Sequence, residues 1–135
     1  MDITSLQWLI GDRIKSGKYD AESKNWLIKF ESGALLNIEC LWRLLEEDVI
    51  CSSSEDHEHK FGLAKSFNGE AALTEMGEHE IKNISVTSGV GDIVFTLGEL
   101  FKLQVIVTSA GYEAWQIKNK NGQSIVAVSG QLNVF

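Results

Sequence analysis

The sequence predicts an α+β fold in which two units, each a short helix followed by an antiparallel meander, form a mostly antiparallel β-sheet with the short helices packed on it. Three observations support this prediction. Apolar and polar residues alternate along many short segments, as half-buried strands require. Turn residues such as Glu31-Ser32-Gly33 and Asn121-Gly122 separate these segments. The 135 residues include no proline, which would interrupt a sheet ladder.

Composition places the chain among ordinary globular domains. Its 135 residues are 44% hydrophobic and 23% charged, so we expect one domain, residues 1–135, rather than a disordered or fibrous chain. No apolar run approaches the roughly 18–20 residues that span a bilayer, and the first residues lack the pattern of a signal peptide. Two cysteines, Cys40 and Cys51, are too few for a disulfide framework. A reduced, cytoplasmic protein is the expectation.

The first half predicts one helix and a series of strands. Asp2 or Thr4 can cap a short helix that ends near Ile10, before Gly11. Strands are expected over residues 14–19, around 26–30, along the extended run 34–45 and at 48–51, with a loop over 52–60. In the extended run, four alternate residues share one face: Leu36, Ile38, Cys40 and Trp42.

The second half repeats this order. Asn68 is a suitable N-cap, Glu70 favours the first turn, and Gly77 ends a helix expected over Ala71–Met76. Strands are expected at residues 81–87, 92–97, 100–108, 113–118, 123–128 and 132–135. Asn119-Lys120-Asn121-Gly122 predicts a hairpin turn, because Asn-Gly tolerates positive φ.

The two halves match when the chain is shifted by 67 residues, from Ile14 to Ile81. The same shift aligns Leu6 with Leu73, and apolar positions continue to match without a gap from residue 6 to residue 51. We therefore predict an internal repeat with units at approximately residues 3–60 and 68–135, each too small to bury a good core alone. The pattern leaves open whether the units share one sheet or form two.

Charge is the feature that bears most on partners. The net charge is −7, which argues against general binding to nucleic acids or anionic membranes. Acids concentrate between residues 46 and 58, a segment without lysine or arginine. The candidate partner-binding residues are Glu46, Glu47, Asp48, Glu55, Asp56 and Glu58. One interpretation is a solvated loop kept soluble by its charge. The other is an acidic surface that steers a basic partner into contact.

No residue pattern selects an active site. His57-Glu58-His59 places two imidazoles on one strand face, but a third ligand at a defined spacing is missing. Cys40 falls on an apolar strand face, and Cys51 has no basic neighbour that would favour a thiolate. We therefore expect no catalytic residues, no metal and no cofactor, and hence no enzyme.

A family resemblance lies in the C-terminal stretch Tyr112-Glu113-Ala114-Trp115, followed by Asn121-Gly122, Gly130 and Leu132. It resembles a family of small uncharacterised bacterial proteins that end in a Tyr-Glu-x-Trp strand, an Asp/Asn-Gly turn and a Gly-x-Leu strand. Members show a duplicated helix-plus-meander unit with a glycine after each short helix, which implies the same fold here. Gly33 stands where the family has its Asp-Gly turn, whereas the second unit has Leu100 there.

Size, acidity and β-rich pattern also look like those of immunity proteins of bacterial toxin–immunity systems, including contact-dependent growth inhibition. This resemblance implies a cytoplasmic, non-enzymatic protein that binds and neutralises a cognate toxin domain, expected to be a nuclease with a basic active site, through an acidic surface. The alternative is a generic protein-binding or self-associating scaffold module that uses its sheet edges. An enzyme or small-ligand binder would instead need a large polar cavity with converging carboxylates or His79.

Overall fold

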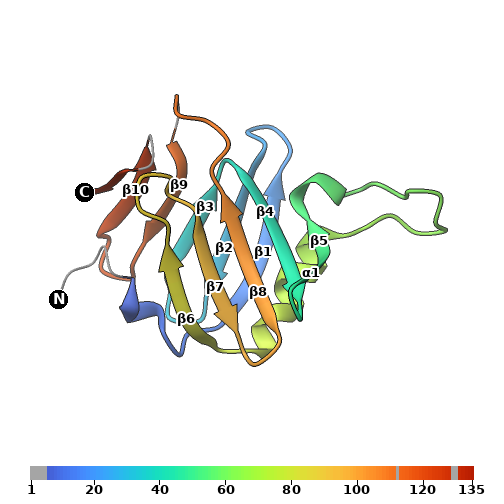
Figure 1. Ribbon diagram of the computed structural model, residues 1–135, viewed down its shortest axis with the longest axis horizontal. Helices are drawn as coiled ribbons and strands as arrows, with labels where there is room; N and C mark the ends of the chain where they lie inside the picture. Colours follow the sequence, from blue (N-terminus) through green and yellow to red (C-terminus); the bar gives the residue numbers. More distant parts are fainter. Residues whose placement is uncertain (1–5, 112, 129–130) are drawn as a thin grey trace.

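The computed structural model describes residues 6–111, 113–128 and 131–135, and within them the chain forms two antiparallel sheets packed face to face (Figure 1). The first sheet has the order β1 (Ile14–Asp20), β2 (Asn25–Phe30), β3 (Leu35–Ile38), β9 (Glu113–Lys118), β10 (Ser124–Val128) and β11 (Gln131–Val134). The second has the order β5 (Val49–Ser53), β4 (Leu41–Glu46), β8 (Phe101–Ile106), β7 (Ile93–Leu97) and β6 (Ile81–Val86). The mostly antiparallel sheet structure is confirmed, and it is divided between two sheets.

Helical structure is limited to short pieces. The described residues contain one α-helix, α1 (Gly69–Glu75), and the 3-10 turns η2 (Gln7–Leu9), η3 (Ser54–Asp56) and η4 (Met76–Glu78). Asn68 caps α1 as expected, since its side-chain oxygen accepts the N–H of Ala71 at 3.0 Å.

The prediction of a helix that ends near Ile10 is wrong for the described part of the chain, where residues Gln7–Leu9 form only the 3-10 turn η2. Leu6, directly before η2, has a φ of 58°, a left-handed conformation that an α-helix cannot include. Asp2 and Thr4, the expected caps, lie outside the described residues.

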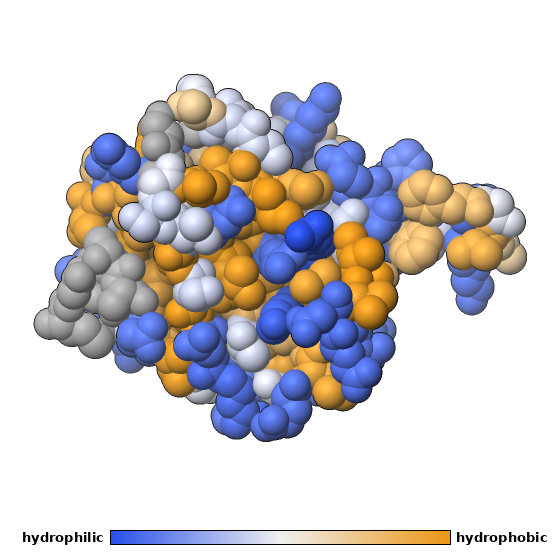
Figure 2. All heavy atoms as spheres, viewed as in Figure 1, coloured by the Kyte–Doolittle hydropathy of each residue, from blue (hydrophilic) through white to orange (hydrophobic). Residues whose placement is uncertain are grey.

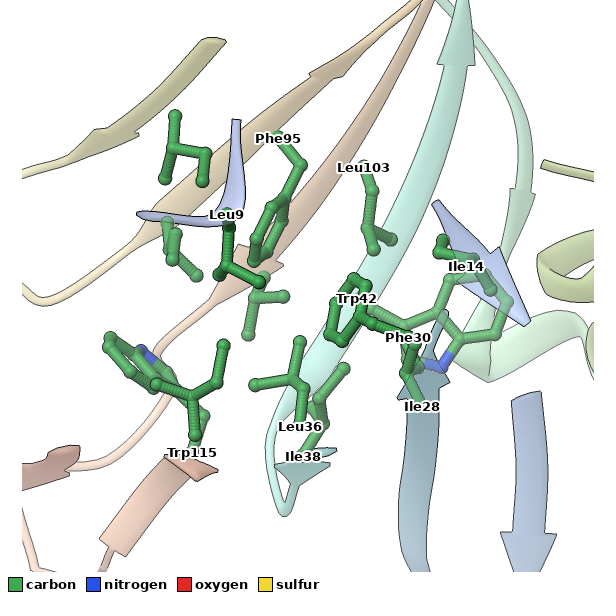
Figure 3. Close-up of a cluster of buried hydrophobic side chains, with 14 of the residues drawn as sticks. Leu9, Ile14, Ile28, Phe30, Leu36, Ile38, Trp42, Phe95, Leu103 and Trp115 are labelled. Carbon is green, nitrogen blue, oxygen red and sulfur yellow. The ribbon is translucent and has the colours of Figure 1, made fainter. Parts of the chain in front are cut away.

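The core fills the space between the two sheets. Figure 3 shows part of this core, with Leu36 and Ile38 lying between Trp115 and Trp42 in that view. The two tryptophans come from opposite sheets, and all four side chains are fully buried. The core thus joins the sheets through large side chains contributed by both of them.

The extended run of residues 34–45 is two strands rather than one. β3 ends at Ile38, which pairs with Trp115 in the first sheet, and β4 begins at Leu41, which pairs with Ile106 in the second. Both strands turn their apolar faces to the same core, so the alternation of the sequence continues across the break. Cys40 lies at this crossing and is only half-buried, whereas the pattern places it on the buried face.

The meanders β1–β2–β3 and β6–β7–β8 have the same register. Ile14 pairs with Phe30 in the first meander. Ile81 pairs with Leu97 in the second, and these two residues lie 67 positions after Ile14 and Phe30 respectively. The offset holds through β3 and β8, including an irregularity after the first residue of β1 and of β6. Beyond β3 the strand pairing no longer follows the gapless match expected to residue 51, because β3 pairs with β9 in the first sheet and β8 pairs with β4 in the second.

The helix α1 covers the outer edge of the first sheet at β1. The N–H of Gly17 donates to Thr74 Oγ1 at 3.2 Å, and the N–H of Tyr19 donates to Glu70 Oε2 at 2.9 Å. Side chains of the helix therefore satisfy edge groups that could otherwise pair with another strand. Leu73 packs directly on Gly17, where an added Cβ would lie 2.6 Å from the Leu73 Cβ.

Candidate functional site

The six candidate acids form two groups at opposite ends of β5. The first group is Glu46, Glu47 and Asp48, and the second is Glu55, Asp56 and Glu58. The first group lies at the end of β4 and in the turn to β5. The turn residues Glu47 and Asp48 both have positive φ, as a tight hairpin requires. At about 3.3 Å per residue, the five residues of β5 separate the groups by about 16 Å. The structure therefore divides the acidic segment into two patches.

Most of these carboxylates face solvent. Asp56 is half-buried and the other five residues are exposed. Asp48 Oδ1 lies 2.8 Å from Lys102 Nζ, and Glu58 Oε1 lies 3.7 Å from His57 Nε2. The other four acids form no ion pair with a described residue. Their negative charges are therefore available to attract a basic partner that approaches this edge of the molecule.

Apolar side chains lie between the two acidic groups. β5 is the edge strand of the second sheet, and its Val49 and Ile50 are 66% and 53% exposed. An apolar centre with a charged rim is the usual anatomy of a protein–protein interface. The edge formed by β5 has this arrangement.

Residues 58–67 form a segment that projects from the sandwich next to the second acidic group (Figure 1). Two backbone hydrogen bonds close its base, from the Glu58 N–H to the Phe67 carbonyl and from the Phe67 N–H to the His59 carbonyl, each 2.8 Å. Phe61 and Leu63 are 65% and 59% exposed, and Figure 2 shows apolar atoms along the projecting segment. Phe61 and Leu63 are therefore available to contact a partner that approaches the second acidic group.

A cavity of about 530 Å³ opens beside the second acidic group. It is enclosed by the ends of β1 and β2, the crossing between β3 and β4, and residues 54–59. Three carboxylates line it, those of Glu39, Glu55 and Glu58, together with the ammonium group of Lys24. Glu39 is not among the acids that the sequence pattern singles out, because only the crossing between sheets brings it here.

One wall of the cavity is aromatic. Tyr19 and Trp26 lie with their ring centroids 4.9 Å apart, and the His57 ring contacts both, at 5.4 and 4.9 Å. His57 Nδ1 accepts the N–H of Gly69 at 3.0 Å. That bond holds the imidazole in place and assigns its proton to Nε2. Gly69 is required here, since an added Cβ would lie 2.6 Å from a ring carbon of Trp26.

The two imidazole rings of His57-Glu58-His59 pack against different residues. The His57 ring packs within the aromatic wall, whereas the His59 ring stacks on Phe61 with centroids 5.6 Å apart. In the described ranges no group of three or more His, Cys, Asp or Glu side chains is placed to hold a metal ion. His79 lies outside the lining of the cavity and packs on Phe101, with ring centroids 4.8 Å apart.

The two cysteines are poor sources of thiolate. Burial raises the pKa of the Cys40 thiol to about 12, and the nearby Asp92 and Glu39 carboxylates add to the effect. Partial burial also raises the pKa of the Cys51 thiol, with a further contribution from the Glu46 carboxylate. Cys40 lines the cavity, but it is a protonated thiol there at neutral pH.

We expect iodoacetamide to modify Cys51 at least about tenfold faster than Cys40 at pH 8, because Cys51 is the exposed thiol and Cys40 forms so little thiolate. The rate at Cys40 should still rise about tenfold per pH unit between pH 8 and 11, since its pKa of about 12 lies above that range. Mass spectrometry of the Cys40→Ser and Cys51→Ser variants measures each thiol separately. A plateau in the Cys40 rate near pH 9 would contradict the assignment.

Comparison with protein-family models, with curated proteins and with solved structures finds no match to this chain. In the described part of the chain, no helix has both the length and the apolar character needed to cross a membrane.

Proposed function

We propose that this protein is a non-enzymatic immunity protein that binds a cognate bacterial toxin domain, a nuclease with a basic active site, and neutralises it in the cytoplasm. The observation that supports this most is the edge at β5, where exposed Val49 and Ile50 lie between two groups of carboxylates. A basic cleft would be attracted by both acidic groups and would bury the apolar residues between them. Charge of this kind mainly raises the association rate.

The acidity of this edge is not a requirement of the fold. β10 and β5 hold corresponding places in the two sheets. β10 is the hairpin partner of β9, which pairs with β3, and β5 is the hairpin partner of β4, which pairs with β8. The turn before β10, residues 119–123, has no acid and contains Lys120, and four of the five β10 residues are buried. The acids at β5 therefore contribute something other than strand pairing, and partner binding accounts for them.

We also infer that residues 3–60 and 68–135 are two copies of one unit built on an antiparallel meander, preceded by α1 in the second copy and by the 3-10 turn η2 in the described part of the first. The common register of the two meanders supports this inference. So do two equivalent backbone bonds, from the Glu31 N–H to the Arg13 carbonyl at 2.8 Å and from the Gly98 N–H to the Glu80 carbonyl at 2.9 Å. Under this inference only the first copy acquired the acidic edge.

The test is charge reversal at each acidic group. The variants E46K/E47K/D48K and E55K/D56K/E58K are each expected to slow association with the toxin domain about tenfold or more and to flatten its dependence on salt. The candidate toxin domain for this test is the C-terminal domain of whatever protein is encoded immediately upstream, co-expressed with this chain. Stopped-flow mixing measures the rate, and recovery of growth measures protection.

The control variant is E31K/E75K/E113K, which makes the same change in net charge at exposed positions in the β2–β3 turn, on α1 and on β9. It should associate at close to the wild-type rate. Equal slowing by all three variants would mean that net charge alone matters and would reject the β5 edge as the binding surface. Absence of any complex, together with an upstream domain that leaves growth unaffected, would reject the immunity function.

A scaffold module is the second candidate, favoured by the exposed edge of β5. A peptide or another copy of the chain could pair with this edge, because edge strands present unpaired backbone groups. A proline at Ile50 would then abolish association, whereas reversal of the carboxylates would change it little. The immunity proposal expects the reverse order of effects.

A further inference from the structure

We propose that the cavity between β1–β2, the β3–β4 crossing and residues 54–59 binds an arginine side chain of the protein partner. This inference rests on the proposed function, since it assigns one contact within the complex with a basic toxin domain. The cavity volume of about 530 Å³ falls within the roughly 300–1,000 Å³ of typical ligand pockets and exceeds what one side chain occupies.

Charge selects a cation for this cavity. Glu39 comes from the β3–β4 crossing, Glu55 and Glu58 come from residues 54–59, and all three line the cavity, where Lys24 supplies the positive charge among the lining residues. Carboxylates therefore outnumber the ammonium group in the lining three to one, which opposes phosphates and carboxylates as guests. The Tyr19 hydroxyl is a further group of the lining residues that can bind polar atoms of the guest, whereas the Ser54 hydroxyl is held by the Trp42 N–H and carbonyl.

The aromatic wall selects a planar organic cation. A guanidinium group stacks on aromatic faces while it donates two parallel hydrogen bonds to a carboxylate, which a lysine ammonium group cannot do. Tyr19 supplies a half-buried ring in the lining, with His57 (side chain 11% exposed) and Trp26 (3% exposed) packed against it. A hard metal ion would instead require oxygen ligands alone.

The wall is held in position before any guest arrives. The Gly69 N–H fixes the His57 ring, and Glu70 Oε2 accepts the N–H of Tyr19 at 2.9 Å. Both anchors belong to α1, which is packed on β1. A site whose groups are already ordered loses less conformational entropy on binding, so a single guanidinium can be recognised there.

The experiment titrates the full chain with N-acetyl-arginine methylamide and follows backbone and indole N–H signals by NMR. We expect saturable binding with shifts confined to the cavity, and at least about tenfold weaker binding by the E39Q/E55Q/E58Q variant. The control variant E46Q/E47Q/D48N removes the same number of charges at the other end of β5 and should bind as the wild type does. The citrulline derivative, which has the same shape without the charge, should not bind.

Equal binding by the two variants, or by the citrulline derivative, would overturn the assignment of the cavity. A second arm measures the complex with the toxin domain, whose affinity should fall at least about tenfold with E39Q/E55Q/E58Q. If free arginine derivative binds but this complex is unaffected, the guest is a small molecule and the assignment to a partner side chain is wrong. Protection from the toxin without any arginine binding would reject the cavity while leaving the immunity function intact.

Discussion

Gly77→Ala is expected to lower the free energy of unfolding by roughly 3 kcal/mol, the upper end of the usual range for overpacked sites. A Cβ on Gly77 would lie 2.2 Å from the carbonyl oxygen of Ile14 and 3.4 Å from its carbonyl carbon. Both are backbone atoms, so no change of rotamer relieves the overlap. The junction between η4 and β1 would have to open, although Arg13 Nη1 ties it by donating to the Glu78 carbonyl at 2.7 Å.

Urea unfolding followed by tryptophan fluorescence measures this loss. Gly111→Ala is the matched control, because its added Cβ would meet Ser109 Oγ at an ordinary 3.6 Å. We expect the control to lie within about 0.5 kcal/mol of the wild type. Equal stability of the two variants would show that the η4–β1 junction accommodates a methyl group.

Trp115→Phe is expected to cost about 1–3 kcal/mol more than Trp42→Phe, although both rings are fully buried. The two residues occupy equivalent positions in the strand pairing. Trp42 pairs with Val105, Trp115 pairs with Ile38, and Ile38 and Val105 are themselves separated by the offset of 67 residues. Trp115 Nε1 donates to the Gly91 carbonyl at 2.8 Å, whereas Trp42 Nε1 is buried without a hydrogen-bond partner among the described residues.

The difference arises from what each substitution leaves behind. Phenylalanine at position 115 leaves the Gly91 carbonyl without this donor, which adds a desolvation cost to the lost packing. Phenylalanine at position 42 removes an unsatisfied N–H, which offsets part of the lost packing. Urea unfolding of both variants measures the difference directly. Greater destabilisation by Trp42→Phe would mean that its indole N–H interacts favourably in the folded state, for example with the Trp26 ring that it meets edge-on at 5.0 Å.

The position of Trp42 connects stability to the cavity. Trp26 packs on Trp42 from one side and forms part of the aromatic wall on the other. Gly69 fits against both rings, since an added Cβ would lie 2.6 Å from Trp26 and 3.1 Å from Trp42. Substitutions in this group are therefore expected to alter arginine binding as well as stability, which is why the tests of the cavity use its carboxylates instead.

Local features of the fold could be predicted from the sequence because they depend on residues a few positions apart. The cap of Asn68 on α1 is one case, and the Asn121-Gly122 turn between β9 and β10 is another. The strand positions follow from the alternation of buried and exposed residues. The N-terminal helix was the exception, since apolar spacing cannot reveal the left-handed conformation of Leu6.

By itself, then, the sequence determined most of the β-strands, the capped helix α1 and the presence of an acidic segment. Only the tertiary structure decided that the run 34–45 crosses between sheets at Cys40, because strands on either side of one core show the same alternation. The crossing places Glu39 in the lining of the same cavity as Glu55 and Glu58, while β5 separates those two acids from Glu46. These neighbours are set by long-range strand pairing, whose energy depends on segments far apart in the chain.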